Sequence, residues 1–112
     1  MMIASEKQGA VTVLTPAVPL TGDHPEELTA AINAQLGQGL PQLVLDLTST
    51  PLMDSGGLEA LLDARDSVRA RGGVIRIAGP NPLVNDALVA SGVGDHFELF
   101  GNTKAAVGSF AR

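Results

Sequence analysis

Residues 53–58, which read MDSGGL, form the segment of this chain whose side chains most directly suggest chemistry. The order Asp-Ser-Gly-Gly is typical of the loop that carries the nucleophilic serine in proteases of the chymotrypsin type. Such a serine needs a histidine as general base and a carboxylate that orients the histidine. His24, Asp46 and Ser55 follow one another in the required chain order. Hydrolysis is therefore the first hypothesis to test.

The remainder of the chain argues against hydrolysis. A chymotrypsin-type site lies between two β-barrels, which a 112-residue chain of alternating strands and helices cannot supply. An α/β-hydrolase needs the pattern G-x-S-x-G with a histidine downstream. His96 does lie downstream, but Met53 occupies the position of the first glycine. Neither His24 nor His96 has a second ligand at metal-binding spacing, so both are expected to be solvated. We predict no catalytic residue, no metal and no cofactor.

Ser55 lies instead between a predicted strand and a predicted helix. Functional loops gather at the carboxyl ends of strands in parallel α/β sheets. A helix N-terminus also offers unpaired N–H groups and a partial positive charge. The simplest interpretation is that Asp54 or Ser55 caps the helix. Gly56 and Gly57 weaken a first helical turn, which favours a further role, and the sequence leaves both interpretations open.

Composition and charge limit the functions that the chain can have. Its 112 residues, about 45% of them hydrophobic, suit one domain with one packed core. The absence of cysteine excludes a disulfide framework and fits a reducing compartment. A net charge of −5 and the absence of Trp and Tyr argue against a nucleic-acid surface. We find no secretory segment and no membrane-spanning apolar run, so we expect a soluble, cytoplasmic protein without membrane insertion.

Glycine and proline residues divide the chain into alternating strands and helices. Strands are predicted from β-branched and apolar residues over 9–14, 42–47, 73–79 and 97–100. Helices are predicted from apolar spacing and end signals over 23–37, 58–72, 81–92 and 102–110. The first helix is expected to begin at the cap Asp23 with Pro25 in its first turn, and the third at the cap Asn81 followed by Pro82.

The alternation predicts an α/β fold, with a single domain over residues 1–112. The expected sheet is mixed but largely parallel, with four to five strands and about four helices. Pro16 and Pro19 confine the segment after the first strand to a sheet edge or an extended loop. The first strand or two can therefore add an antiparallel edge.

With these elements placed, the chain resembles a STAS domain, the fold of bacterial anti-sigma-factor antagonists. The resemblance is closest over residues 43–106 and looser over the whole chain. It rests on a hydrophobic strand with an Asp near its end, followed by the pattern D-S-x-G-L at the start of an amphipathic helix. The segments RGG, NPLVNDALVASGV and F-x-x-F then follow in the order and spacing of the family.

The resemblance implies that Ser55 is a phosphoacceptor, supported by the loop residues Asp54, Gly56, Gly57 and Leu58. In that family the unmodified antagonist binds an anti-sigma factor or serine kinase and frees the sigma factor. The kinase uses ATP to phosphorylate the serine, which breaks the complex, and a phosphatase restores it. The chain would then be the substrate of a kinase and not itself an enzyme. Its implied partners are the anti-sigma factor or serine kinase and the phosphatase.

Two positions depart from the pattern of the family. Thr21 stands where the family usually carries an acidic residue, and Gly56 stands where it often carries Ser or Thr. Thr21 and Met53 are the residues that we expect to contact a partner. Because some STAS domains are unphosphorylated subunits of transport or stress-signalling assemblies, such a subunit is the alternative function. Rival phosphorylation sites lie close by in the sequence at Ser49, Thr50 and Ser67.

Overall fold

The computed structural model describes residues 3–23, 26–37 and 39–111, and within these ranges the chain forms one five-stranded sheet of order β1-β2-β3-β4-β5. Strand β1 pairs with β2 in antiparallel orientation, and the other neighbours are parallel. The mixed, largely parallel α/β sheet with an antiparallel edge is therefore confirmed. The strands are β1 (Ile3–Gln8), β2 (Val11–Pro16), β3 (Gln42–Asp46), β4 (Val74–Ala78) and β5 (Leu99–Phe100).

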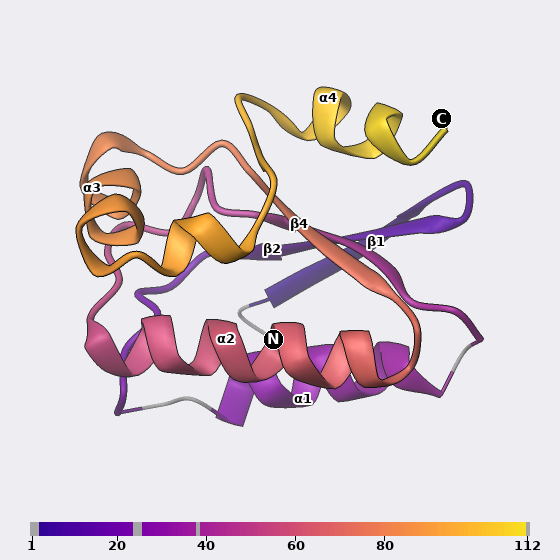
Figure 1. Ribbon diagram of the computed structural model, residues 1–112, viewed down its shortest axis with the longest axis horizontal. Helices are drawn as coiled ribbons and strands as arrows, with labels where there is room; N and C mark the ends of the chain where they lie inside the picture. Colours follow the sequence, from indigo (N-terminus) through magenta and orange to yellow (C-terminus); the bar gives the residue numbers. More distant parts are fainter. Residues whose placement is uncertain (1–2, 24–25, 38, 112) are drawn as a thin grey trace.

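Four α-helices of the described residues surround this sheet, as expected. Figure 1 shows α1 and α2 side by side on one face of the sheet, α4 on the other face, and α3 beyond the carboxyl ends of the central strands. In the described ranges no helix has both the length and the apolar character needed to cross a bilayer. The helices are α1 (Glu26–Leu36), α2 (Ser55–Ala70), α3 (Pro82–Ser91) and α4 (Thr103–Gly108), with 3-10 turns η1 (Val93–His96) and η2 (Ser109–Ala111).

Two hydrophobic clusters hold the layers together, one on each face of the sheet. Successive strand residues point to opposite faces, so Leu43 and Leu45 pack toward α1 and α2 while Val44 packs toward α4. The larger cluster contains the buried faces of α1, α2 and α3. The smaller cluster lies under α4 and includes Ala106, with Phe110 packed against it. The α2 side of the sheet therefore carries most of the core.

The start of α3 follows the sequence signals closely. The Asn81 side chain accepts a hydrogen bond from the Val84 N–H at 2.8 Å, and Pro82 is the first helical residue. Gly92 ends the helix in the left-handed conformation, with a φ of 80°. The predicted cap, first position and terminating glycine of this helix are all confirmed.

The structure adds one strand that is not predicted and moves two predicted boundaries. No strand is predicted at β1, because Ile3 is the one buried residue among its six and the apolar signal is almost absent. Strand β2 begins at Val11 and not at Gly9, because Gly9 belongs to the turn between the two antiparallel strands and has a φ of 65°. Helix α2 begins at Ser55 and not near Gly57 or Leu58.

The expected start of α1 lies partly outside the described residues. His24 and Pro25, predicted as a solvated side chain and as a first-turn residue, lie outside the described residues. The described helix begins at Glu26. The acidic side chains of Glu26 and Glu27 lie in its first turn and interact favourably with the positive end of the helix dipole.

Candidate functional site

The loop that carries Ser55 begins at the carboxyl end of β3, and hydrogen bonds attach its first half to the ends of β2 and β4 and to the cap of α3. Leu47 donates its N–H to the Ala78 carbonyl at 2.9 Å, and the buried Thr50 donates its hydroxyl to the Pro16 carbonyl at 2.9 Å. The Asn81 side chain donates to the Thr50 carbonyl at 3.0 Å. The ends of β2 and β4 and the start of α3 therefore fix the first half of this loop.

The second half of the loop is attached to the segment between β2 and α1. Leu20 donates its N–H to the Leu52 carbonyl at 3.0 Å, and Asp54 donates its N–H to the Leu20 carbonyl at 3.2 Å. These bonds form an isolated parallel bridge between Leu20 and Met53. The bridge turns the Met53 side chain into the core, where it is only 7% exposed. The Met53 side chain therefore offers little surface, and its contact with a partner stays a prediction.

Asp54 caps α2 and also holds the neighbouring segment. Its Oδ1 atom accepts hydrogen bonds from the Gly57 N–H at 2.9 Å and from the Gly22 N–H at 3.0 Å. The first of these bonds is the N-cap interaction expected for an aspartate before a helix. The second joins residues 32 positions apart in the chain. Of the two capping residues left open by the sequence, Asp54 is the one that caps.

Replacing Asp54 by Ala is expected to lower the free energy of unfolding by about 1 to 2 kcal/mol, because the helix loses its cap and Gly22 loses its acceptor. Urea denaturation followed by circular dichroism measures this loss. Asp54→Asn is the matched control, since its side-chain oxygen can still accept both bonds and should retain most of the stability. Equal stability of the wild type and Asp54→Ala would show that the two bonds contribute nothing.

Gly56 and Gly57 allow two backbones to approach closely. A Cβ atom on Gly56 would lie 2.3 Å from the Gly22 Cα, and a Cβ on Gly57 would lie 2.0 Å from the Leu20 carbonyl oxygen. Both distances are far shorter than any real contact of a Cβ atom. The two glycines therefore have a structural reason, which is the packing of α2 against residues 20–22. Their presence does not by itself indicate a ligand or a partner.

Ser55 has no such structural task. Its side chain is exposed and makes no hydrogen bond with any residue that the structure describes. The Leu58 N–H bonds to the Asp54 carbonyl and the Gly57 N–H bonds to the Asp54 side chain. The N–H groups of Ser55 and Gly56 have no acceptor in the described part of the chain and lie at the positive end of the helix dipole.

The surface beside Ser55 combines carboxylates with exposed apolar groups. A hollow of about 260 Å³ is lined by Gly22, Gly56, Glu59, Ala60 and Asp63, with two carboxylates and no basic residue among them. Thr21 directly precedes the lining residue Gly22 in the chain and is half-buried. Leu52, three residues before Ser55, is 40% exposed. The surface next to Ser55 is therefore acidic, with one partly exposed apolar side chain nearby.

The rival phosphorylation sites differ in accessibility. Thr50 is fully buried and its hydroxyl is bonded to the Pro16 carbonyl, so a kinase cannot reach it in the folded chain. Ser49 is exposed and Ser67 on α2 is half-buried. His96 lies at the end of η1 and is exposed. Within residues 3–23, 26–37 and 39–111 no group of three or more potential ligands is arranged to hold a metal ion.

Residues 20–22 belong to the site, and the sequence indicated only one of them. The sequence predicts a role for Thr21 as a partner contact. Leu20 and Gly22 instead supply the contacts to Asp54, Gly56 and Gly57. The one available signal was a glycine at position 22 together with two glycines at the start of α2. Three glycines in segments far apart in the sequence are consistent with close packing of two backbones.

Comparison with known proteins agrees with the fold described above. A family model described as STAS domain matches residues 2–106. Among curated proteins, none matches the chain by sequence.

Solved structures resemble the chain in fold at low sequence identity. A candidate anti-sigma factor antagonist from Thermotoga maritima superposes with a TM-score of 0.88 at 18% identity, covering 99% of this chain and 96% of that one. SpoIIAA of Bacillus in its phosphorylated form gives a TM-score of 0.72 at 19% identity, covering 96% and 98%. The murine anion transporter Slc26a9 gives 0.79 at 20% identity, covering 91% of this chain but 18% of the transporter.

Proposed function

We propose a function on one premise: the chain belongs to the STAS domain family. Within this family we propose that it is an anti-sigma-factor antagonist that acts by partner switching. The unmodified chain binds an anti-sigma factor that is also a serine kinase. Phosphorylation of Ser55 by that kinase, with ATP as donor, releases the chain, and a phosphatase restores binding. The chain is thus a binding protein of the cytoplasm and the substrate of an enzyme.

The observation that carries the proposal is the state of Ser55. Its neighbours in the motif all have structural tasks, since Asp54 caps the helix and Gly56 and Gly57 pack against residues 20–22. Ser55 is exposed and its hydroxyl has no partner among the described residues. A serine is therefore presented at the surface by a loop that is held firmly in place and that does not need the hydroxyl.

The position also tolerates a phosphate. A phosphoserine adds about −1.5 to −2 charges and three acceptor oxygens. The Ser55 and Gly56 N–H groups at the start of α2 are available as donors, and the helix dipole favours an anion there. The fold should therefore survive modification, while a partner seated over the same surface would meet a new charge. The solved phosphorylated form of SpoIIAA, which has the same fold, supports this inference.

A second candidate is an unphosphorylated STAS subunit of a transport or stress-signalling assembly. The likeness to Slc26a9 favours it, because there the matched domain is a small part of a longer chain. Thr21, in place of the usual acid beside the phosphorylated serine, also favours this candidate. In that case Ser55 would remain unmodified and the partner would stay bound.

Mass spectrometry of the protein from its own host tests the proposal. We expect one phosphate on Ser55 whose occupancy differs between growing and stressed cells, and none on a Ser55→Ala variant. Fragment spectra separate Ser55 from the exposed rival Ser49. Absence of phosphate on Ser55 in every condition, with partners co-purifying equally with wild type and Ser55→Ala, would favour the static subunit. A phosphate found on Ser49 alone would show that Ser49, and not Ser55, is the phosphorylated residue.

A further inference from the structure

A second cavity lies on the chain away from Ser55, between the C-terminal half of α2 and the edge of β4. It has a volume of about 210 Å³. Because α2 rises about 1.5 Å per residue, its arginines lie about 15 to 21 Å along the helix from Ser55. The lining residues are Arg65, Arg69, Gly73, Val74, Ile75, Arg76, His96, Phe97 and Glu98.

The charge of this cavity is opposite to that of the protein. Three of the seven Lys and Arg residues of the chain line it, against a single carboxylate, Glu98, in a molecule of net charge −5. Arg65 and Arg69 are four residues apart on α2 and therefore lie on the same side of the helix, where like charges repel. The repulsion between Arg65 and Arg69 therefore slightly lowers the stability of α2 unless an anion binds between them.

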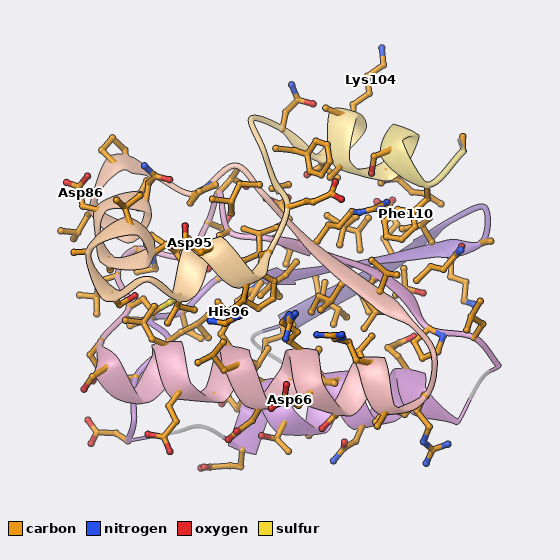
Figure 2. The ribbon with its side chains drawn as sticks, viewed as in Figure 1. Asp66, Asp86, Asp95, His96, Lys104 and Phe110 are labelled. Atoms are coloured by element: carbon orange, nitrogen blue, oxygen red, sulfur yellow. The ribbon has the colours of Figure 1, made fainter. Side chains whose placement is uncertain are left out.

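The three arginines differ in how far the fold uses them. Arg76 is largely used by the fold, since its Nη1 donates to the Ser109 hydroxyl at 2.9 Å and its guanidinium lies 4.2 Å from the centre of the Phe110 ring. Its Nε is buried and lies 3.6 Å from Glu98 Oε2, but it makes no hydrogen bond among the described residues. Figure 2 shows Phe110 on the α4 side of the sheet. Arg76 therefore belongs to the packing of the C-terminal segment.

Arg65 and Arg69 keep donors free. Arg65 Nε donates to the His96 carbonyl at 2.7 Å, which fixes the guanidinium at the cavity, and its Nη1 has only a long contact of 3.8 Å with the exposed Asp66. The Arg69 side chain has no hydrogen bond or ion pair with any residue in the described ranges. Figure 2 shows His96 between η1 and α2, and His96 also lines the cavity.

The edge of β4 adds a backbone donor. Val74 donates its N–H toward β3, to the Pro41 carbonyl, and Ile77 donates toward β5, to the Glu98 carbonyl. Because N–H groups alternate in direction along a strand, the Ile75 N–H points to the same edge as that of Ile77. Strand β5 pairs only with Ile77 and Ala78. The Ile75 N–H is therefore left facing the cavity between the two arginines and the segment before β5.

We propose that this cavity binds a small anion that carries a phosphate or carboxylate group, held by Arg65, Arg69 and the Ile75 N–H. Planar guanidinium groups bind both kinds of anion in bidentate fashion. The volume lies below the roughly 300 to 1,000 Å³ of pockets for drug-sized ligands, so the ligand is a small phosphate ester or a di- or tricarboxylate. The site does not depend on the modification of Ser55.

Titration of the ¹⁵N-labelled chain with inorganic phosphate, and separately with citrate, tests this proposal at constant ionic strength. We expect saturable shifts of the Ile75 and Phe97 amide signals with at least one probe, and the stronger probe identifies the group. Arg69→Gln should weaken binding about tenfold or more, since it removes charge-assisted hydrogen bonds. Lys104→Gln is the matched control, because this substitution also removes one positive charge. Lys104 lies on α4 and points away from the sheet (Figure 2).

Arg65→Gln should weaken binding in the same way, but it also removes the bond to the His96 carbonyl and can lower stability. The Arg69→Gln variant should keep the stability of the wild type, because the Arg69 side chain is exposed. Shifts that fail to saturate with both probes would overturn the proposal. So would equal affinities of wild type and Arg69→Gln, which would leave Arg69 as a basic residue that stabilises the last turn of α2.

Discussion

Replacing Gly57 by Ala should lower the free energy of unfolding by about 2 to 3 kcal/mol, the upper range for overpacking in a tightly packed site. The added methyl group would lie 2.0 Å from the Leu20 carbonyl oxygen and 2.6 Å from the Leu20 carbonyl carbon. Both atoms belong to the backbone, and the Leu20 N–H and C=O are bonded to the Ser55 loop. Relief of the clash must therefore move α2 away from residues 20–22.

Alanine otherwise stabilises a helix by as much as about 1 kcal/mol relative to glycine, so the expected loss is a net value. Gly108→Ala is the matched control, because Gly108 also lies in a helix and nothing is within 4 Å of a Cβ placed there. That variant should be as stable as the wild type or slightly more stable. Chemical denaturation of the three proteins gives the comparison. A Gly57→Ala variant as stable as Gly108→Ala would refute the close approach of the two segments.

Local signals in the sequence predicted much of this fold. The cap of α3 at Asn81, its first residue Pro82 and its terminating Gly92 depend on neighbours in the chain, and all are present in the structure. The alternation of strands and helices after Leu43 gave the parallel part of the sheet for the same reason. Strand β1 escaped prediction because five of its six residues are exposed. Its place in the sheet is determined by pairing with β2.

The candidate site could be located but not constructed from the sequence. The pattern around Ser55 gave its place at the start of α2, and the exposed position agrees with that prediction. The roles of Asp54 and Gly57 depend on Gly22 and Leu20, which are more than 30 residues away in the chain. No local pattern contains such contacts. The burial of Met53 likewise follows from its bridge to the distant Leu20.

A negative charge at Ser55 should strongly weaken binding of the proposed partner while leaving the fold intact. We expect Ser55→Asp to bind the proposed anti-sigma-factor partner about a hundredfold or more weakly than the wild type, because a charge placed in an interface and left unpaired costs several kcal/mol. The same charge at the first position of α2 interacts favourably with the helix dipole. The thermal midpoint of the variant should therefore stay close to that of the wild type. Calorimetric titration of the partner, obtained by co-purification with Ser55→Ala, measures the affinity.

Two controls separate the effect of the charge from the effects of shape and location. Ser55→Asn has the shape of Ser55→Asp without the charge and should bind far more tightly than it. Ser49→Asp places the same charge on an exposed residue of the same loop and should bind nearly as the wild type does. If Ser55→Asp binds as tightly as Ser55→Asn, a charge at this position does not control the partner. The helix start at Ser55 would then be an anchor in a permanent assembly, and the exposed hydroxyl would have no regulatory role.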